Sequence, residues 1–167
     1  MVPVRPKLDE IPTFYATRSR QYDRNRTFIP YNNVALNVGN GLDVSSGLFT
    51  APMKGIYFIS FAALKMWGTL KLCVQLKHNN VTIATRQLSA DPSYTFSRQQ
   101  WIGLNLQSTL LMEVGDTVGV YLHEGVLYDV DPYVGVGRDV AAIMTDDNGK
   151  SITTKNTVFT GFIVQVL

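Results

Sequence analysis

The run of residues 55–64 constrains the fold most, because its ten positions, Gly-Ile-Tyr-Phe-Ile-Ser-Phe-Ala-Ala-Leu, are apolar almost throughout. A short apolar run rich in aromatic and β-branched residues predicts a strand that is buried on both faces. Helical periodicity is almost absent elsewhere. Apolar and polar residues alternate, and turn residues interrupt them at intervals of roughly eight to twelve positions. The pattern predicts an all-β sandwich or barrel.

Length and composition fit one folded unit. The chain has 167 residues, of which 46% are hydrophobic and 17% are charged. The charged share lies below the roughly 25% of an average soluble domain, which indicates that part of the surface is covered in an oligomer. Residues 1–12 are rich in proline and charge and are expected to form a flexible N-terminal arm. Residues 13–167 are expected to form a single globular domain.

The charge balance argues against a nucleic-acid partner. The formal net charge is +2 and the positive residues are not gathered on one predicted face. One local exception is the set Arg18, Arg20, Arg24 and Arg26, which is expected to be a solvated arm. No stretch approaches the ~18 consecutive apolar residues that a membrane-spanning helix needs.

Strands are expected at several places along the chain. They cover residues 14–16, 34–38, 48–50, 55–64, 70–77, 81–85, 101–113, 117–122 and 157–164. Turns are expected at residues 39–41, 78–80 and 114–116, and longer loops at residues 89–99 and 124–155.

Widely spaced aromatic and small residues form a recognisable order. The sequence places Tyr31, Asn37, Leu42, Phe49 and then Gly55-x-Tyr57-x-Ile59-x-Phe61, with later elements Glu113-Val114-Gly115-Asp116 and Phe159-Thr160-Gly161-Phe162. This order resembles the signature of the C1q-domain family. Tyr31 and Ile59 stand where that family usually has Phe, and both substitutions keep an apolar side chain.

The resemblance implies a ten-stranded jelly roll of the C1q and tumour-necrosis-factor type that assembles as an extracellular homotrimer. No collagen-like Gly-X-Y run and no signal peptide occur in the chain, so a stalkless globular member is expected. Relatives bind carbohydrates, microbial surfaces, immune complexes or receptors. The expected function is therefore a secreted, lectin-like pattern-recognition protein of innate immunity. A receptor-binding signalling ligand and an extracellular structural building block remain as alternatives.

Two polar loops carry the candidate ligand-binding residues, which are Tyr94 and Arg98 in the first and Tyr133, Arg138 and Asp139 in the second. A sugar site needs an aromatic face beside planar hydrogen-bonding groups, and an arginine suits the carboxylate of a sialic acid. The alternative interpretation is that they are ordinary loop residues.

Calcium is left open, because some relatives bind it. The candidate ligands are Asp91, Asp146 and Asp147, although residues 146–149 also suit a type I′ turn. Asp129-x-Asp131 begins like a calcium loop, but Val140 stands where a bidentate Glu would be needed. Asn25 and Asn80 lie in Asn-x-Thr sequons and are candidate glycosylation sites.

Enzyme motifs are lacking. The two histidines, His78 and His123, do not form a zinc-protease motif, and no P-loop or Gly-x-Ser-x-Gly sequence occurs. Cys73 is the single cysteine and lies in a strand-like run, where a packed, inert thiol is expected. The sequence therefore predicts a binding protein rather than an enzyme.

Overall fold

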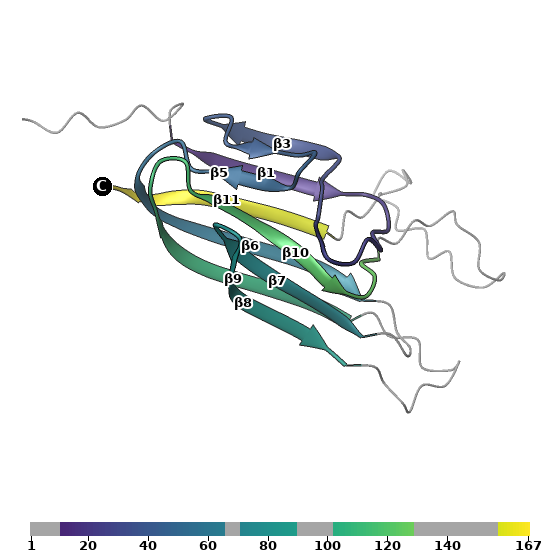
Figure 1. Cartoon of the computed structure of the whole chain (residues 1–167). Helices are drawn as coiled ribbons and strands as arrows, with labels where there is room; N and C mark the ends of the chain where they lie inside the picture. The colour runs from purple at the N-terminus through teal and green to yellow at the C-terminus, as the bar shows by residue number, and fades with distance from the viewer. Residues whose placement is uncertain (1–10, 66–70, 90–101, 129–156) are drawn as a thin grey trace, which may run out of the picture.

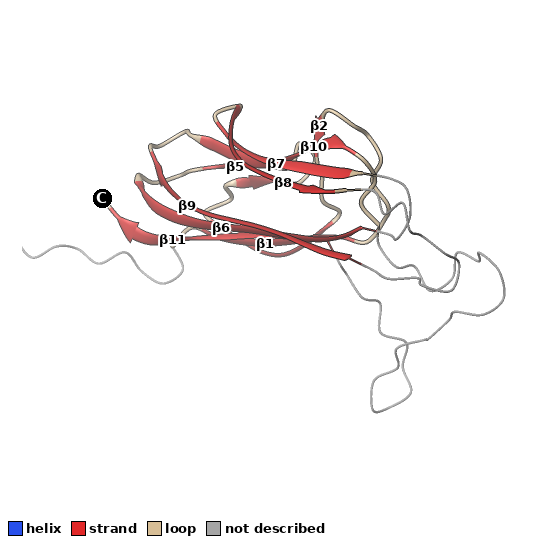
Figure 2. Cartoon of the chain, turned by 90° about the horizontal axis from the view of Figure 1, so that it is seen from below, coloured by secondary structure: helices blue, strands red, loops and turns tan. Residues whose placement is uncertain are grey.

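Two antiparallel β-sheets lie face to face in the computed structural model, which describes residues 11–65, 71–89, 102–128 and 157–167. Figure 1 shows the strands running roughly along one direction, and Figure 2 shows the two layers edge-on. The core lies between these layers, as expected when alternate side chains of each strand point inward.

The first sheet has five strands in the order β3-β1-β11-β6-β9. Its strands are β1 (Thr13–Arg18), β3 (Asn33–Val38), β6 (Gly55–Lys65), β9 (Ile102–Met112) and β11 (Thr157–Val166). The first and last strands of the chain are thus neighbours near the middle of the sheet.

The second sheet has the order β4-β5-β10-β7-β8, and β2 also pairs with β10. Its strands are β2 (Thr27–Phe28), β4 (Leu42–Asp43), β5 (Leu48–Thr50), β7 (Leu72–His78), β8 (Val81–Leu88) and β10 (Thr117–Glu124). The prediction of an all-β jelly roll is confirmed. The described strands number eleven rather than ten, and two of them, β2 and β4, have only two residues each.

Strand β6 corrects one expectation. Its burial alternates strictly, so Tyr57, Ile59 and Phe61 are almost fully buried, while Phe58 between them and Ala62 after them are half-buried. The prediction that both faces of this strand are buried is therefore wrong for the single chain. The outward positions of β6 are largely apolar, and the described part of the chain leaves them only half-buried.

Aromatic side chains from distant parts of the sequence meet in the core. The ring of Phe14 lies 4.7 Å from that of Phe49 and 4.8 Å from that of Phe159, measured between centroids. Gly161 makes this packing possible, because a Cβ atom there would lie 2.6 Å from the Phe14 ring and 2.7 Å from Ile59. The glycine of the Phe-Thr-Gly-Phe element is thus required by a close approach rather than by a turn.

Tyr31 introduces the one unpaired buried side-chain polar atom among the described residues. Its ring stacks on Phe159 with centroids 5.3 Å apart, and burial raises the pKa of its phenol well above the ordinary value. We expect Tyr31→Phe to raise the free energy of unfolding by about 1 kcal/mol, because it removes a desolvated hydroxyl that gains no hydrogen bond in return. Urea unfolding of the two proteins checks this. A loss of stability would mean that the hydroxyl has a partner in the folded protein.

Candidate interaction surfaces

The outward face of the five-stranded sheet carries exposed apolar side chains together with uncharged polar ones, such as Ser60, Asn105 and Gln107. Register places Tyr15 opposite Leu36, and Phe162 opposite Phe58. The rings of Phe58 and Phe162 lie 5.4 Å apart between centroids, and Phe162 remains 43% exposed. Further exposed apolar side chains on these strands are Val34, Leu111, Val164 and Val166. Several large apolar side chains exposed on one sheet face favour an interaction site there.

This sheet also carries almost no charge. Within its five strands the charged residues are Arg18 and Lys65, each at the last position of its strand. By contrast, the strands of the other sheet include Lys77, Arg86 and Glu124. A sheet face that lacks charged residues and exposes several apolar side chains favours burial against a partner, since the solvent-facing side of an antiparallel sheet is normally polar.

A second candidate surface is the end of the sandwich opposite the C-terminus (Figure 2). Here the end of β6 pairs with the start of β9 through Lys65 and Ile102, and the start of β7 pairs with the end of β8. Leu64 also bridges Tyr128, at the point where the chain leaves the described structure after β10. Three sequence segments, residues 66–70, 90–101 and 129–156, therefore join the sandwich at this one end.

Those segments carry all the ligand and metal residues proposed from the sequence. Tyr94, Arg98, Tyr133, Arg138 and Asp139 lie outside the described residues, as do the metal candidates Asp91, Asp146 and Asp147. Their roles stay predictions. The structure adds that the strand ends which bear the two loops are neighbours in space.

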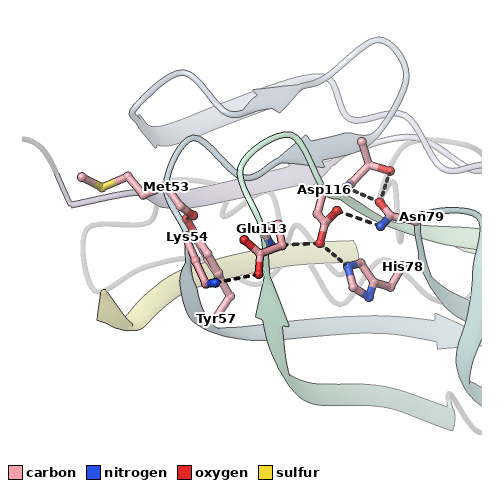
Figure 3. A network of polar contacts seen from close by, with 8 residues as sticks. Met53, Lys54, Tyr57, His78, Asn79, Glu113 and Asp116 are labelled. Carbon is pink, nitrogen blue, oxygen red and sulfur yellow. Dashed lines mark hydrogen bonds and ion pairs between the residues drawn. The ribbon is translucent and has the colours of Figure 1, made fainter. Parts of the chain in front are cut away.

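The opposite end holds a polar network that the sequence did not predict (Figure 3). One Asp116 carboxylate oxygen accepts hydrogen bonds from the Glu113 backbone N–H at 2.9 Å and contacts His78 Nε2 at 3.1 Å. The other accepts a bond from Asn79 Nδ2 at 2.9 Å, and the Asn79 side-chain oxygen accepts one from the Thr117 backbone N–H at 2.8 Å. These contacts tie the β9–β10 turn to the β7–β8 turn.

The network is structural in character. The sequence predicts turns at residues 78–80 and 114–116 but no contact between them. Asn79 in the first and Asp116 in the second are the residues that could have suggested such a contact. Every polar group of Asp116 has a partner, and Lys54 is paired with Glu113 at 2.9 Å beside it. The arrangement therefore serves to hold the two turns together.

Hydrogen bonds from Asn79, from the Glu113 backbone and from His78 hold the pKa of Asp116 below its ordinary value. A carboxylate with a depressed pKa in the folded state stabilises the fold above its unfolded pKa of about 3.9, and this contribution is lost as the pH falls through the folded pKa. We therefore expect the thermal midpoint of the native protein to fall below about pH 4. In Asp116→Asn that acid-dependent fall should be smaller, because the titrating group is gone. Equal falls in both proteins between pH 5 and pH 2 (about one unit above and two units below the unfolded value), measured by circular dichroism, would contradict this assignment.

The two candidate glycosylation sites lie within the described residues. Asn25 and Asn80 are both exposed, and Asn80 has a positive φ of 64° at the β7–β8 turn. Both are accessible, and their glycosylation stays a prediction. Cys73 is buried, and burial raises the pKa of its thiol, which agrees with a packed side chain.

Metal clusters and membrane-spanning helices are both absent from the described segments. Residues 11–65, 71–89, 102–128 and 157–167 contain no group of three or more His, Cys, Asp or Glu side chains placed to hold a metal ion. The same part of the chain contains no helix long and apolar enough to cross a membrane.

The jelly-roll sandwich with an apolar sheet face defines a class, the globular domains of the C1q and tumour-necrosis-factor type. The globular domain of zebrafish complement 1qA has a similar structure, with a TM-score of 0.64 and 16% identity, covering 93% of this chain and 99% of that one. Murine APRIL is also similar, with a TM-score of 0.58 and 11% identity over 92% of this chain and 99% of that one. At such identities these likenesses concern the fold.

The C1q-domain family model matches residues 13–131, and the chain therefore belongs to the C1q-domain family. Human complement C1q tumor necrosis factor-related protein 3 is 28% identical over 115 residues, which cover 69% of this chain and 44% of the relative. The mouse protein of the same name matches with the same identity and coverage. The chain thus spans less than half the length of these curated relatives.

Proposed function

We propose that this chain is the recognition domain of a secreted homotrimer, which acts by binding rather than by catalysis. The observation that carries the proposal is the outward face of the five-stranded sheet. It combines the tilted ring pair of Phe58 and Phe162 with Tyr15, Leu36 and Leu111, and its strands hold no charge except at two ends. Burial of this face between identical subunits, related by rotation about a common axis, removes the apolar area from water.

Assembly through this face leaves one end of the sandwich available to a partner. This loop-bearing end is the one opposite the C-terminus, where residues 66–70, 90–101 and 129–156 join the strands. The segments that join the sandwich there contain aromatic, arginine and carboxylate residues, the groups that protein sites use for sugars. Loops on a rigid β scaffold commonly carry recognition. The proposed ligand is accordingly a carbohydrate on a microbial or cell surface, with calcium as an optional bridge.

A receptor-binding ligand is the second candidate. It is favoured by the sequence similarity to a C1q tumor necrosis factor-related protein and by the structural similarity to APRIL. In that case a membrane protein, rather than a glycan, contacts the trimer.

A glycan array separates the two. The purified chain is applied once with calcium and once with EDTA. Selective binding to one sugar class supports the recognition function, and loss of that binding in EDTA assigns a metal to the site. Blank arrays under both conditions, together with saturable binding to cells that free sugars do not inhibit, would replace this function with the receptor-ligand one.

A further inference from the structure

The loop between β1 and β2 displays an arginine cluster that the proposed function has not used. Arg20, Arg24 and Arg26 are all exposed. The sequence predicted a solvated arm here, and this is wrong for Arg18, which ends β1 and is half-buried. Figure 1 shows the loop passing beside the end of β10, at the same end of the sandwich as the three joining segments.

Arg18 organises the first half of the loop. Its Nε donates to the backbone oxygen of Arg20 at 2.9 Å, and its Nη1 donates to that of Pro30 at 2.9 Å. Its guanidinium lies 4.6 Å from the ring centroid of Tyr22. Because the guanidinium group of Arg18 already makes these contacts, Arg18 positions the loop and is not available to bind an anion.

Tyr22 and Arg26 fix the loop to the body of the sandwich. The backbone of Tyr22 exchanges two hydrogen bonds with Leu127, at 3.0 and 2.9 Å, and its hydroxyl contacts Thr27 Oγ1 at 2.6 Å. The Arg26 N–H donates to the Leu122 oxygen at 2.6 Å, and Arg26 adopts a φ of 60°. A left-handed conformation costs free energy for a side chain of this size. An arginine therefore occupies a position that a glycine would fill without strain.

The exposed guanidinium groups have no acidic partners in the described part of the chain. Its ion pairs join Lys54 to Glu113 and His78 to Asp116, both at the other end of the sandwich. The pKa of Arg18 is lowered by burial first and also by the charges of Arg20 and Arg24, so these cations lie within electrostatic reach of one another. Residues 18–26 hold four arginines and one carboxylate, Asp23, and such an excess of positive charge attracts an anion from solution.

We propose that residues 18–26 bind an acidic polysaccharide, through Arg20, Arg24 and Arg26. The proposal rests on the glycan-recognition function and places an anionic subsite on the described part of the loop-bearing end. A guanidinium pairs in bidentate fashion with either sulfate or carboxylate, which are the charged groups of such polymers. Clustered arginines on a loop held by backbone hydrogen bonds bind a repeating anion without a large ordering cost.

Other polyanions fit the loop less well. Single-stranded nucleic acids are held largely by stacking on exposed aromatic rings, whereas Tyr22 is only 6% exposed and its hydroxyl is bonded. Anionic membranes favour basic surfaces that also insert apolar side chains. The exposed positions of this loop are polar or charged throughout, as in Gln21, Asp23 and Asn25.

The test measures affinity for immobilised heparin and for immobilised polysialic acid, the first sulfated and the second carboxylated. Bacterially produced full-length chain is used, so that Asn25 carries no glycan. We expect native protein to bind at least one polymer at about 0.15 M salt, with an affinity that falls as salt rises. Arg20→Ser combined with Arg24→Ser should weaken binding roughly tenfold or more. Each pair between an arginine and an anionic group contributes a sizeable part of a tenfold change in affinity.

Matched controls separate the loop from overall charge. The double variant Lys54→Ser and Lys77→Ser also removes two positive charges, but outside the loop. It should change the affinity for the polymer by less than about twofold. Arg26→Gly retains the loop conformation, because glycine tolerates the positive φ, and should lower affinity without lowering the thermal midpoint. Asp23→Asn should raise affinity.

Three results would overturn the proposal: no retention of the native protein by either polymer, equal losses in the two double variants, or equally tight binding of a DNA oligonucleotide. Its failure is distinguishable from failure of the proposed function. Selective glycan-array binding that the arginine variants leave unchanged would keep glycan recognition and remove this subsite. A blank array would remove the broader function itself.

Discussion

Phe162→Asp is expected to convert the assembled protein to a folded monomer. Phe162 lies on β11 at an outward position, 43% exposed, against Phe58 of the neighbouring strand. Loss of the ring removes roughly 1.5–3 kcal/mol of apolar burial at each copy of the interface, and every 1.4 kcal/mol is worth about tenfold in affinity. A new carboxylate without a partner adds a desolvation penalty. Sedimentation velocity at micromolar concentration measures the result.

Ile83→Asp is the matched control for this change. Ile83 is a similarly exposed apolar residue, at 39%, on β8 of the other sheet. It should leave the assembly intact, because the interface is proposed on the five-stranded sheet alone. Dissociation by both variants, or by neither, would contradict that location. Circular dichroism should show retained β structure in both proteins.

Phe159→Ala is expected to destabilise the fold by about 3–5 kcal/mol, which is a large part of the 5–15 kcal/mol that stabilises a typical domain. Phe159 stands three residues before Phe162 on the same strand, but it points inward and is fully buried. Its ring contacts those of Phe14 and Tyr31, so truncation leaves a cavity among rigid neighbours. Guanidinium unfolding at a fixed protein concentration gives the change.

Phe28→Ala provides the comparison for that loss. Phe28 is half-buried in the two-residue strand β2, where its ring meets Tyr121 edge-on at 5.4 Å. The space left by truncating Phe28 is open to solvent. The loss in the free energy of unfolding should therefore be much smaller than for a buried cavity. A similar cost for the two substitutions would show that the core around Phe159 relaxes to fill the gap.

The alternating pattern was enough to predict the β class, because side-chain direction along a strand follows directly from sequence spacing. Residues such as Tyr57, Ile59, Phe61 and Gly161 lie in the core as their signature positions imply. The error at β6 has a physical cause. An apolar residue on the outward face of a strand contributes the same sequence pattern as one buried within the chain.

The polar network and the arginine loop were not predictable in the same way. Asp116 meets Asn79 and His78 through contacts between turns 37 and 38 residues apart, and spacing within one turn says nothing about the other. Similarly, the apparent arm of arginines becomes an ordered loop because Tyr22 bonds to Leu127, more than one hundred positions later. The ligand residues Tyr94 and Arg138 stay sequence predictions, since they lie outside the described residues.

The mass of the native protein in solution tests the central claim most directly. Sedimentation equilibrium at micromolar concentration should give three times the 18.6 kDa of one chain, because three copies cover one another's apolar sheet faces. A mass of one chain, with the β structure intact, would contradict the account. The exposed face of β1, β6 and β11 would then have to be stable in water without a partner.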